Sequence, residues 1–473
     1  MTPLPSRKDT RATAKSALTA KSALTALSAL TALTALTALT APLAAQATSV
    51  FEGVRVIPMD QERLLENQTV VVQDGRITAI GARGSVTIPD GARRIPSEGK
   101  FLMPGLAEMH AHIPAPGAGA TFTENVLFLY VAAGVTSVRG MLGHPTHLTL
   151  RERVESGELV GPRMWTSGPS VNGTSVQTPD SAVRTAAFQQ QAGYDFIKIH
   201  PGLTRPVFDS LNAAADRVGI RFAGHVPVDV GLDRALEAGY WTIDHLDGYV
   251  EALAGRSGQD GGGWFGVAFT DDVEPSGIPA LARRTEDAGV WNVPTQILME
   301  SYATAETADA MLRRPEVRYM PPRTRDQWRQ WKTEAATQQP QPVMDQWIAV
   351  RRTLIKALHD AGAGLLLGSD APQVWNVPGF SVHRELEALV AAGLTPYDAL
   401  VTGTRNIATY LGTADRAGTI AVGKQADLIL LDANPLLDIR NTTRRAGVMI
   451  RGVWHPQSEL EARLAQIAAE YAQ

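Results

Sequence analysis

The stretch RPVFDSLNAAADRVGIRFAGHVPVDVGLDRALEAGYWTIDHL (residues 205–246) repeats one pattern twice. A helical segment ends at a glycine, Gly219 or Gly239, and a short run rich in apolar residues follows. Glycine closes a helix well because it adopts the left-handed conformation without strain. A short apolar run after it is typical of a strand buried on both faces. Alternation of helices and buried strands predicts a parallel sheet covered by helices.

The same pattern recurs along much of the chain, so the prediction extends beyond this stretch. Glycines followed by apolar runs also stand at Gly134, Gly193, Gly289 and Gly362. Repeated helix–strand units of this kind predict the α/β class and, across residues 104–415, a (β/α)₈ TIM barrel. In that fold the active site lies at the carboxyl ends of the strands.

Potential metal ligands stand where these strands should end. Lys198 follows its glycine by five residues, and His225 and His245 follow theirs by six. A strand of roughly five or six residues therefore places all three at carboxyl ends. The first predicted strand adds two imidazoles at alternate positions, which point to the same side. The full set is His110, His112, Lys198, His225, His245 and Asp370.

These residue types suit a pair of divalent metal ions. Imidazoles and a carboxylate are common ligands of zinc, which is the first expectation, and Mn, Fe or Co accept the same set. A protonated lysine would repel the metals, so a metal role for Lys198 requires loss of its proton or modification. Each residue alone has an ordinary structural explanation, and only the combination predicts a binuclear centre.

The motifs around these residues resemble the amidohydrolase superfamily, within it the imidazolonepropionase-like and prolidase-like metal-dependent hydrolases. The resemblance is carried by PGLAEMHAH, FIKIH, GHV, IDH and GSDAP, and it continues into GTIAVGKQADLILLDANPL. Glu108 stands where the family commonly has Asp, and Gly140 follows Arg139 where the family often has Arg-Asp. The resemblance also implies a small β-sandwich built from residues 48–103 and 416–455, and residues 456–473 are predicted to form a C-terminal helix.

The resemblance implies specific roles for the six residues. The first metal would be held by His110, His112 and Asp370, and the second by His225 and His245. Carbamylated Lys198 would bridge the two ions, and a hydroxide between them would attack the substrate carbonyl. Asp370 would then carry the proton to the leaving amine. Asp370 and Lys198 are thus the expected catalytic residues.

The predicted reaction is hydrolysis of amide C–N bonds in a small-molecule substrate. The expected substrates are a dipeptide, an N-acyl amino acid or another carboxylate-bearing amide. Three residues are candidate substrate contacts: Tyr249 as a donor to the carbonyl, His383 on the rim, and Arg139 as a partner for a carboxylate. Two alternatives stay open. The same site would suit an esterase, lactonase or phosphotriesterase, and the chain could be a catalytically silent binding protein.

Composition narrows the possible partners. The formal net charge is −4 with no basic block, so we expect no nucleic-acid partner. The absence of cysteine excludes disulfides and thiolate metal ligands. A homo-oligomer is compatible with this composition.

The first 47 residues predict export. They combine a basic start, an Ala/Leu stretch and the small-residue signal Ala45-Gln46-Ala47, which together are typical of a secretory signal peptide. A periplasmic or secreted protein, free of the membrane after cleavage and beginning at Thr48, is therefore expected. A membrane anchor is the alternative.

Two insertions follow predicted strands on the side of the site. One is GRSGQDGGGWFG (residues 255–266), and the other spans residues 301–342 with Tyr319, Trp328 and Trp331. Loops at this position usually control substrate access. They would either cover an apolar substrate or pack on the fold as inert cover.

Overall fold

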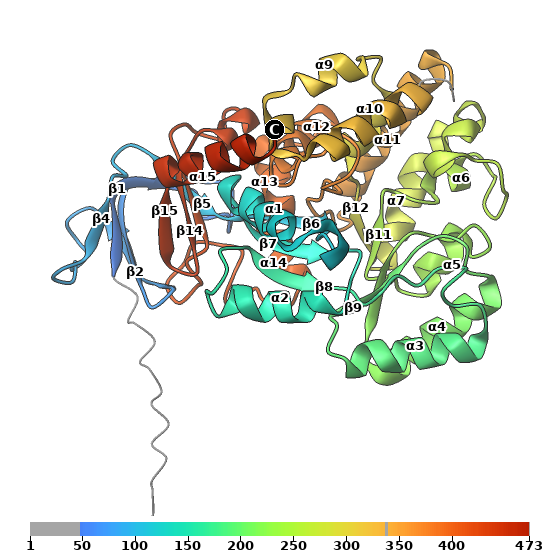
Figure 1. Cartoon of the computed structure of the whole chain (residues 1–473), viewed down its shortest axis with the longest axis horizontal. Helices are drawn as coiled ribbons and strands as arrows, with labels where there is room; N and C mark the ends of the chain where they lie inside the picture. Colours follow the sequence, from blue (N-terminus) through green and yellow to red (C-terminus); the bar gives the residue numbers. More distant parts are fainter. Residues whose placement is uncertain (1–47, 336–338, 473) are drawn as a thin grey trace, which may run out of the picture. The chain divides into compact units, whose positions relative to one another are not determined.

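The computed structural model describes residues 48–335 and 339–472, and the predicted signal peptide lies outside this range. Helices and strands alternate through most of the described chain, which confirms the predicted α/β class (Figure 1). The strands form three sheets, one with strands of both directions and two that are wholly parallel.

An eight-stranded sheet combines strands from both ends of the described chain (Figure 1). Its central strand β5 pairs in parallel with β1 and antiparallel with β13. Apolar residues of these strands, among them Val70, Leu102 and Leu430, are buried together in one cluster. The predicted sandwich segments supply these strands, and their division into two layers stays a prediction. The strands are β1 (Ser49–Val56), β2 (Leu65–Gln73), β3 (Arg76–Ala82), β4 (Arg93–Ile95), β5 (Phe101–Pro104), β13 (Leu428–Leu431), β14 (Arg445–Ile450) and β15 (Val453–Pro456).

Two parallel sheets carry the strands between these segments. One has the order β6-β7-β8 and the other the order β12-β11-β10-β9. Every residue of β6, β9 and β11 is buried, as expected for apolar strands covered on both faces. The strands are β6 (Leu106–Ala111), β7 (Val135–Gly140), β8 (Arg163–Thr166), β9 (Phe196–Ile199), β10 (Arg221–Gly224), β11 (Thr242–Asp244) and β12 (Trp291–Val293).

Isolated parallel bridges link these two sheets at both ends. One bridge joins the end of β8 to β9, and another joins β12 to residues 364–371. That stretch, predicted as the eighth strand, reaches β6 through a third bridge and a backbone hydrogen bond of 2.9 Å from Met109 N to Leu367 O. The three bridges are Ser167–Phe196, Asn292–Leu365 and Ala111–Ala371.

Helices follow most of the parallel strands, and their apolar sides form the main core with the strands. In α4 the buried residues Val207, Phe208 and Leu211 repeat at helical spacing. The helix ends at Gly219, whose φ of 73° lies in the left-handed region, as the sequence predicted. No helix within the described ranges is long and apolar enough to cross a bilayer.

The α-helices have the following bounds, and α15 fills most of the predicted C-terminal helix. They are α1 (Ala120–Ala132), α2 (Thr146–Glu155), α3 (Pro179–Gln191), α4 (Arg205–Val218), α5 (Gly231–Glu237), α6 (Tyr249–Leu253), α7 (Ile278–Asp287), α8 (Gln296–Ala303), α9 (Ala308–Leu312), α10 (Pro322–Ala335), α11 (Gln341–Ala361), α12 (Phe380–Ala391), α13 (Pro396–Thr402), α14 (Arg405–Tyr410) and α15 (Gln457–Glu470).

Arg351 of α11 is fully buried and fastens the ends of two parallel strands. Its guanidinium donates to the carbonyl oxygen of His245 at 2.7 Å and to that of Pro294 at 2.9 Å. A third bond runs to Gln296 Oε1 at 3.1 Å. These two carbonyl groups belong to the residues directly after β11 and β12. Arg351 therefore holds the backbone where the regular hydrogen bonding of each strand has ended.

Replacing Arg351 with Met should therefore destabilise the fold. The change keeps much of the buried volume but leaves two buried carbonyls without their donor, which costs about 2–4 kcal/mol of unfolding free energy. Urea unfolding followed by circular dichroism measures this cost. The matched control is Arg352→Met, which removes the partly exposed ion pair with Glu300 and should cost about 1 kcal/mol or less. Equal losses for the two variants would contradict the role given to Arg351.

Candidate metal centre

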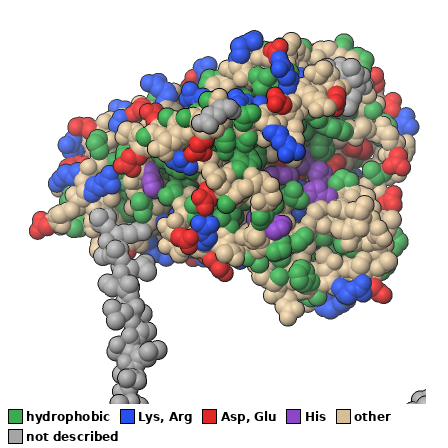
Figure 2. All heavy atoms as spheres, viewed as in Figure 1, with side chains coloured by type: hydrophobic (Ala, Val, Ile, Leu, Met, Phe, Trp, Pro, Cys, Tyr) green, Lys and Arg blue, Asp and Glu red, His purple; other side chains and the backbone are tan. Residues whose placement is uncertain are grey.

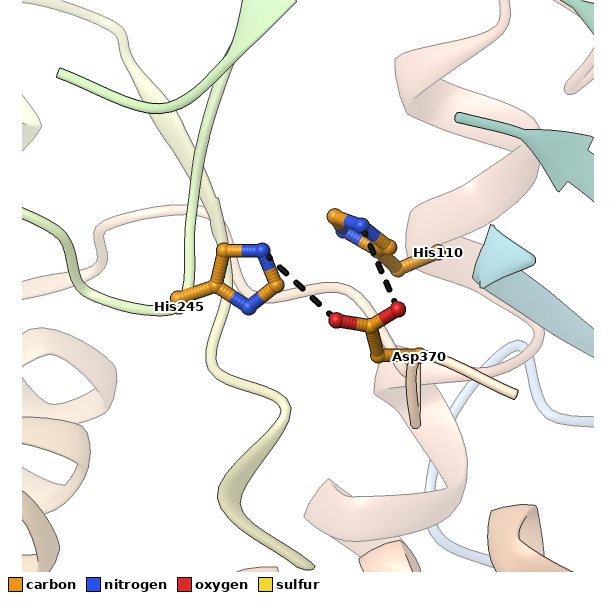
Figure 3. Close-up of side chains that lie close together, drawn as sticks. All are labelled: His110, His245 and Asp370. Atoms are coloured by element: carbon orange, nitrogen blue, oxygen red, sulfur yellow. Dashed lines mark ion pairs between the residues drawn. The ribbon is translucent and has the colours of Figure 1, made fainter. Parts of the chain in front are cut away.

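Three imidazoles surround the carboxylate of Asp370. Asp370 Oδ1 lies 3.0 Å from His112 Nε2 and 3.8 Å from His110 Nε2. Its other oxygen, Oδ2, lies 3.8 Å from His245 Nε2. Figure 3 shows the side chains of His110 and His245 turned toward the two oxygens of this carboxylate. One ligand atom from each of His110, His245 and Asp370 lies within 4.8 Å of the other two, which suits a shared metal ion.

The remaining two predicted ligands lie beside this group. The ring of His225 lies 4.7 Å from the ring of His245, measured between centroids. Lys198, at the end of β9, is fully buried, and its Nζ has no hydrogen-bond partner within the described chain. The nearest acidic atom is Asp244 Oδ2, at 3.6 Å. The structure thus gathers all six residues that the sequence selected, although they come from segments far apart in the chain.

Each of three imidazoles has a polar partner at Nδ1, which leaves Nε2 for the centre. A second partner of this kind fixes the orientation of a metal-binding ring and raises its basicity. This arrangement is what a metal ion requires, so the residues present fit one. The pairs are His110 Nδ1 with Asp244 Oδ2 at 3.1 Å, His225 Nδ1 with Asp247 Oδ2 at 3.0 Å, and His245 Nδ1 with Thr295 Oγ1 at 2.8 Å.

The backbone is strained where it presents these side chains. His245 and Asp370 have φ values of 64° and 65°, in the left-handed region that non-glycine residues rarely adopt. Thr295 has a φ of 46°. Such conformations persist only where the surrounding structure holds them, and they gather at functional sites. Both His245 and Thr295 lie beside carbonyls that Arg351 holds.

Burial sets the protonation states that a metal ion needs. It lowers the pKa of His110 and His245 well below the usual value, so both rings are neutral and able to bind a cation. Burial alone would raise the pKa of Asp370, but electrostatic interactions with His110, His112 and Lys198 outweigh it and lower that pKa to about 2. Burial also lowers the pKa of Lys198. His110 and His245 therefore offer neutral nitrogens, and Asp370 offers an anionic carboxylate.

Asp244 belongs to this centre and escaped the sequence analysis. It is fully buried, accepts hydrogen bonds from Thr242 at 2.8 Å and Arg139 at 3.2 Å, and lies against His110 and Lys198. Arg139 and Lys198 keep its pKa below the ordinary value although burial acts in the opposite direction. The available signal was a charged residue in the middle of the apolar run YWTIDHL, where a carboxylate needs a partner.

Arg139 is not a substrate contact, which corrects one expectation. Its guanidinium is completely buried and donates to Met109 O at 2.7 Å and Tyr410 Oη at 2.6 Å. Together with the bond to Asp244, these contacts occupy the guanidinium inside the fold, so it does not face the cavity. The prediction failed because it assumed that the residue points out from the end of β7.

Tyr249 and His383 are corrected for the same reason. The Tyr249 hydroxyl is buried and bonds to Thr285 Oγ1 at 3.0 Å, in the core below the site. The imidazole of His383, on α12, lies between Thr442 Oγ1 and the carbonyl oxygen of Ala133, both at 2.9 Å. Neither side chain lines the cavity beside the predicted metal ligands.

That cavity has a volume of about 450 Å³ and opens over the imidazoles. Figure 2 shows the histidine side chains gathered in a hollow of the surface. Both predicted insertions reach its wall, the first through Trp264 and Phe265 and the second through Tyr302. The ring of Phe265 lies 5.0 Å from that of His245 and covers the centre. Among the described residues that line the cavity, none is Arg or Lys, and the acidic ones are Asp247, Glu251 and Asp370.

The aromatic wall is itself held in place by a contact between the insertions. Trp264 stacks on Trp331 with centroids 5.2 Å apart, and Tyr302 packs against both rings. Trp328, by contrast, is buried against Trp375 away from the cavity. The second insertion therefore contributes both a cavity wall and inert packing.

Comparison with known proteins identifies the family. Residues 101–455 match the Amidohydrolase family, so the chain belongs to that family. It is 26% identical over 381 residues to an adenine deaminase of Deinococcus deserti, covering 80% of this chain and 56% of the deaminase. It is 22% identical over 410 residues to an imidazolonepropionase of Rhizobium rhizogenes, covering 82% of this chain and 92% of that protein.

A solved structure shares the fold. A Xaa-Pro dipeptidase with bound methionine in its active site superposes with a TM-score of 0.64 at 20% identity, covering 87% of this chain and 100% of the dipeptidase. The resemblance to the amidohydrolase superfamily that the motifs predicted is thereby confirmed. The chain spans little more than half of the adenine deaminase, so that protein's activity is not transferred to it.

The hydroxyl of Thr295 should tune metal binding without touching the metal. Replacing Thr295 with Val removes the partner of His245 Nδ1, and loss of such a partner weakens metal affinity about 10- to 100-fold. Competition for zinc against a chromophoric chelator measures the affinity. The control is Thr285→Val, which removes a buried hydroxyl bond to Tyr249 and should leave metal affinity unchanged. Similar metal affinities for the two variants would contradict the orienting role.

Proposed function

We propose that this protein is a metal-dependent hydrolase of C–N bonds, and specifically of amide bonds. The observation that carries the proposal is the convergence of His110, His112 and His245 on the ionised carboxylate of Asp370. His225 lies beside them, and His110, His225 and His245 each have a polar partner at Nδ1. Membership of the Amidohydrolase family supports it. The catalytically silent alternative finds no support in a ligand set that is complete.

The proposed centre holds two divalent ions, with zinc as the first expectation from the nitrogen and oxygen donors. His110, His112 and Asp370 would hold one ion, and His225 and His245 the other. Lys198, carboxylated on Nζ, would bridge them. Burial favours the neutral amine that reacts with carbon dioxide. Gly224 leaves space for the side chain, because a Cβ at that position would lie 2.8 Å from Lys198 Cδ.

A (β/α)₈ barrel is part of the same proposal. The isolated bridges connect the two parallel sheets and residues 364–371 into one continuous series of parallel neighbours. In a barrel of this type the carboxyl ends of all strands face one rim. This would explain why residues from β6, β9, β10 and β11 meet at one centre.

The chain's own residues would handle the proton and exclude water. Bound divalent ions supply Lewis acidity and make a water molecule acidic near neutral pH. Asp370 is ionised at neutral pH and would accept the proton of the attacking water, then donate it to the leaving nitrogen. Asp247 and Thr295 hold the rings of His225 and His245 in a fixed orientation through contacts at Nδ1. Phe265 covers these rings and limits the access of bulk water.

The residues that line the cavity indicate which class of substrate it would accept. Its aromatic side chains, Trp264, Phe265 and Tyr302, suit an apolar or aromatic group next to the scissile bond. No Arg or Lys is among the described residues of the wall, so a carboxylate of the substrate would find no cationic side chain there. Glu251, by contrast, could accept a hydrogen bond from a donor group of the substrate. Among the substrates predicted from the sequence, this favours dipeptides with an apolar residue over N-acyl amino acids. Esters and phosphotriesters are the alternative substrates that the activity assay must distinguish from amides.

Asp370→Asn separates proton transfer from metal binding. The amide keeps the shape of the side chain but loses the base, so turnover should fall roughly 10²-fold or more while most of the metal stays bound. His245→Ala should lower metal content and activity together, because it removes a direct ligand. The assay is a panel of apolar dipeptides, N-acetyl amino acids and matched esters, with metal content measured on the same samples.

The control for that experiment is Asp260→Asn, a change of the same type at an exposed position of the first insertion. It should leave turnover and metal content unchanged. Near-normal amide hydrolysis by Asp370→Asn would rule out the proton-transfer role. Wild-type protein that binds metal but cleaves esters alone would contradict the amide assignment.

A further inference from the structure

His200 is a cavity residue that the sequence analysis passed over. It follows β9 directly and stands two positions after Lys198, so the extended backbone places both on the same side. Its side chain lines the cavity, and its ring lies 5.3 Å from the ring of His225 between centroids. The residue therefore sits beside a predicted metal ligand without belonging to the predicted set.

A hydrogen-bond chain favours one placement of the ring hydrogen on His200. Asn172 Oδ1 accepts from the backbone N–H groups of Thr174 and Ser175, both at 2.9 Å, so the amide group of Asn172 has a defined orientation. Its Nδ2 consequently faces Ser170 and donates to Ser170 Oγ at 3.1 Å. Ser170 Oγ in turn lies 2.7 Å from His200 Nδ1.

The Ser170 hydroxyl has one hydrogen to donate. Within the described part of the chain, the acceptor at hydrogen-bonding distance from this hydroxyl is His200 Nδ1. A neutral imidazole that accepts at Nδ1 carries its hydrogen on Nε2. The hydrogen bond of the His200 ring to the described residues is made at Nδ1, and the ring forms part of the cavity wall. An N–H donor thus opens into the cavity next to His225.

We propose that His200 donates a hydrogen bond from Nε2 to the acyl oxygen of the substrate and to the negative charge that develops there during attack. The inference rests on the proposed amide hydrolase function. The sequence predicted Tyr249 as the donor to the substrate carbonyl, but the Tyr249 hydroxyl is bonded to Thr285 inside the core. His200 brings a donor to the side of the centre formed by His225, where an acyl oxygen would lie if the second ion polarises it.

A preformed donor of this kind acts on the transition state more than on substrate binding. Loss of one such donor typically costs 10²- to 10³-fold in kcat. His200→Leu should therefore lower kcat about 10²-fold with little change in KM, while the metal content stays that of the wild type. His200→Gln places an amide N–H near the position of Nε2 and should recover at least about tenfold of the loss. A merely structural role would not produce this rescue.

Two other variants test the competing explanations. Tyr302→Phe removes a phenol hydroxyl from the cavity wall, and it should lower kcat less than His200→Leu does. His359→Leu removes an imidazole from α11 outside this cavity and should have no effect. A fall in metal content for His200→Leu would make His200 a metal ligand and overturn the proposal. Unchanged kcat for His200→Leu would overturn it as well.

The tautomer gives a readout that does not depend on activity. Nitrogen-15 NMR of histidine-labelled, zinc-loaded protein should show the His200 ring protonated at Nε2 and unprotonated at Nδ1. Ser170→Ala removes the hydroxyl that fixes this state and should shift population toward the Nδ1–H form. If the wild type cleaves no amide, the proposed function fails, whereas the NMR still decides the proposal for His200. A wild-type ring protonated at Nδ1 would overturn it.

Discussion

The site depends on one constraint, which is that several buried imidazoles must stay neutral and keep one nitrogen free. Burial alone achieves the first condition for His110 and His245 by lowering their pKa. The second condition needs partners at Nδ1, and Asp244, Asp247 and Thr295 supply them. A buried polar atom without a partner is costly, and Lys198 Nζ and Asp370 Oδ1 both lack a well-aligned one among the described residues. Metal ions bound beside them would relieve this cost, which supports the proposed function.

The fold and the centre are joined by charged groups buried behind the ligands. Arg139 links β7 to Asp244 next to His245, and Arg351 links α11 to the carbonyl of His245. Two strained backbone positions, at His245 and Asp370, lie within this frame. Charge that would be unfavourable in an apolar core is therefore paired or bonded to the backbone, and it orients ligands at the same time. The insertions complete the arrangement by closing an aromatic wall over the rings.

The sequence selected residues that the structure brings together, because their signal lies in local order along the chain. The alternation of helix, glycine and buried strand located His225, His245 and Lys198 at strand ends, and the structure brings them together as expected. The same reasoning failed for Tyr249 and Arg139, since position along the chain does not determine the direction of a side chain once the strand has ended. It also missed Asp244 and His200, whose importance comes from neighbours more than twenty residues away. Residues 364–371, predicted as the eighth strand, are held by isolated bridges and irregular backbone that periodicity does not predict.

Metal stoichiometry of the purified protein tests the central claim most directly. Protein prepared with zinc and bicarbonate should hold about two ions per chain by elemental analysis, as expected for a pair of bridged ions. Lys198→Ala should hold about one, because the bridging carbamate is lost while the imidazoles remain. Mass spectrometry under native conditions should show the added carboxyl group on the wild type. A reproducible content of one ion or none in fully active wild-type protein would contradict the account.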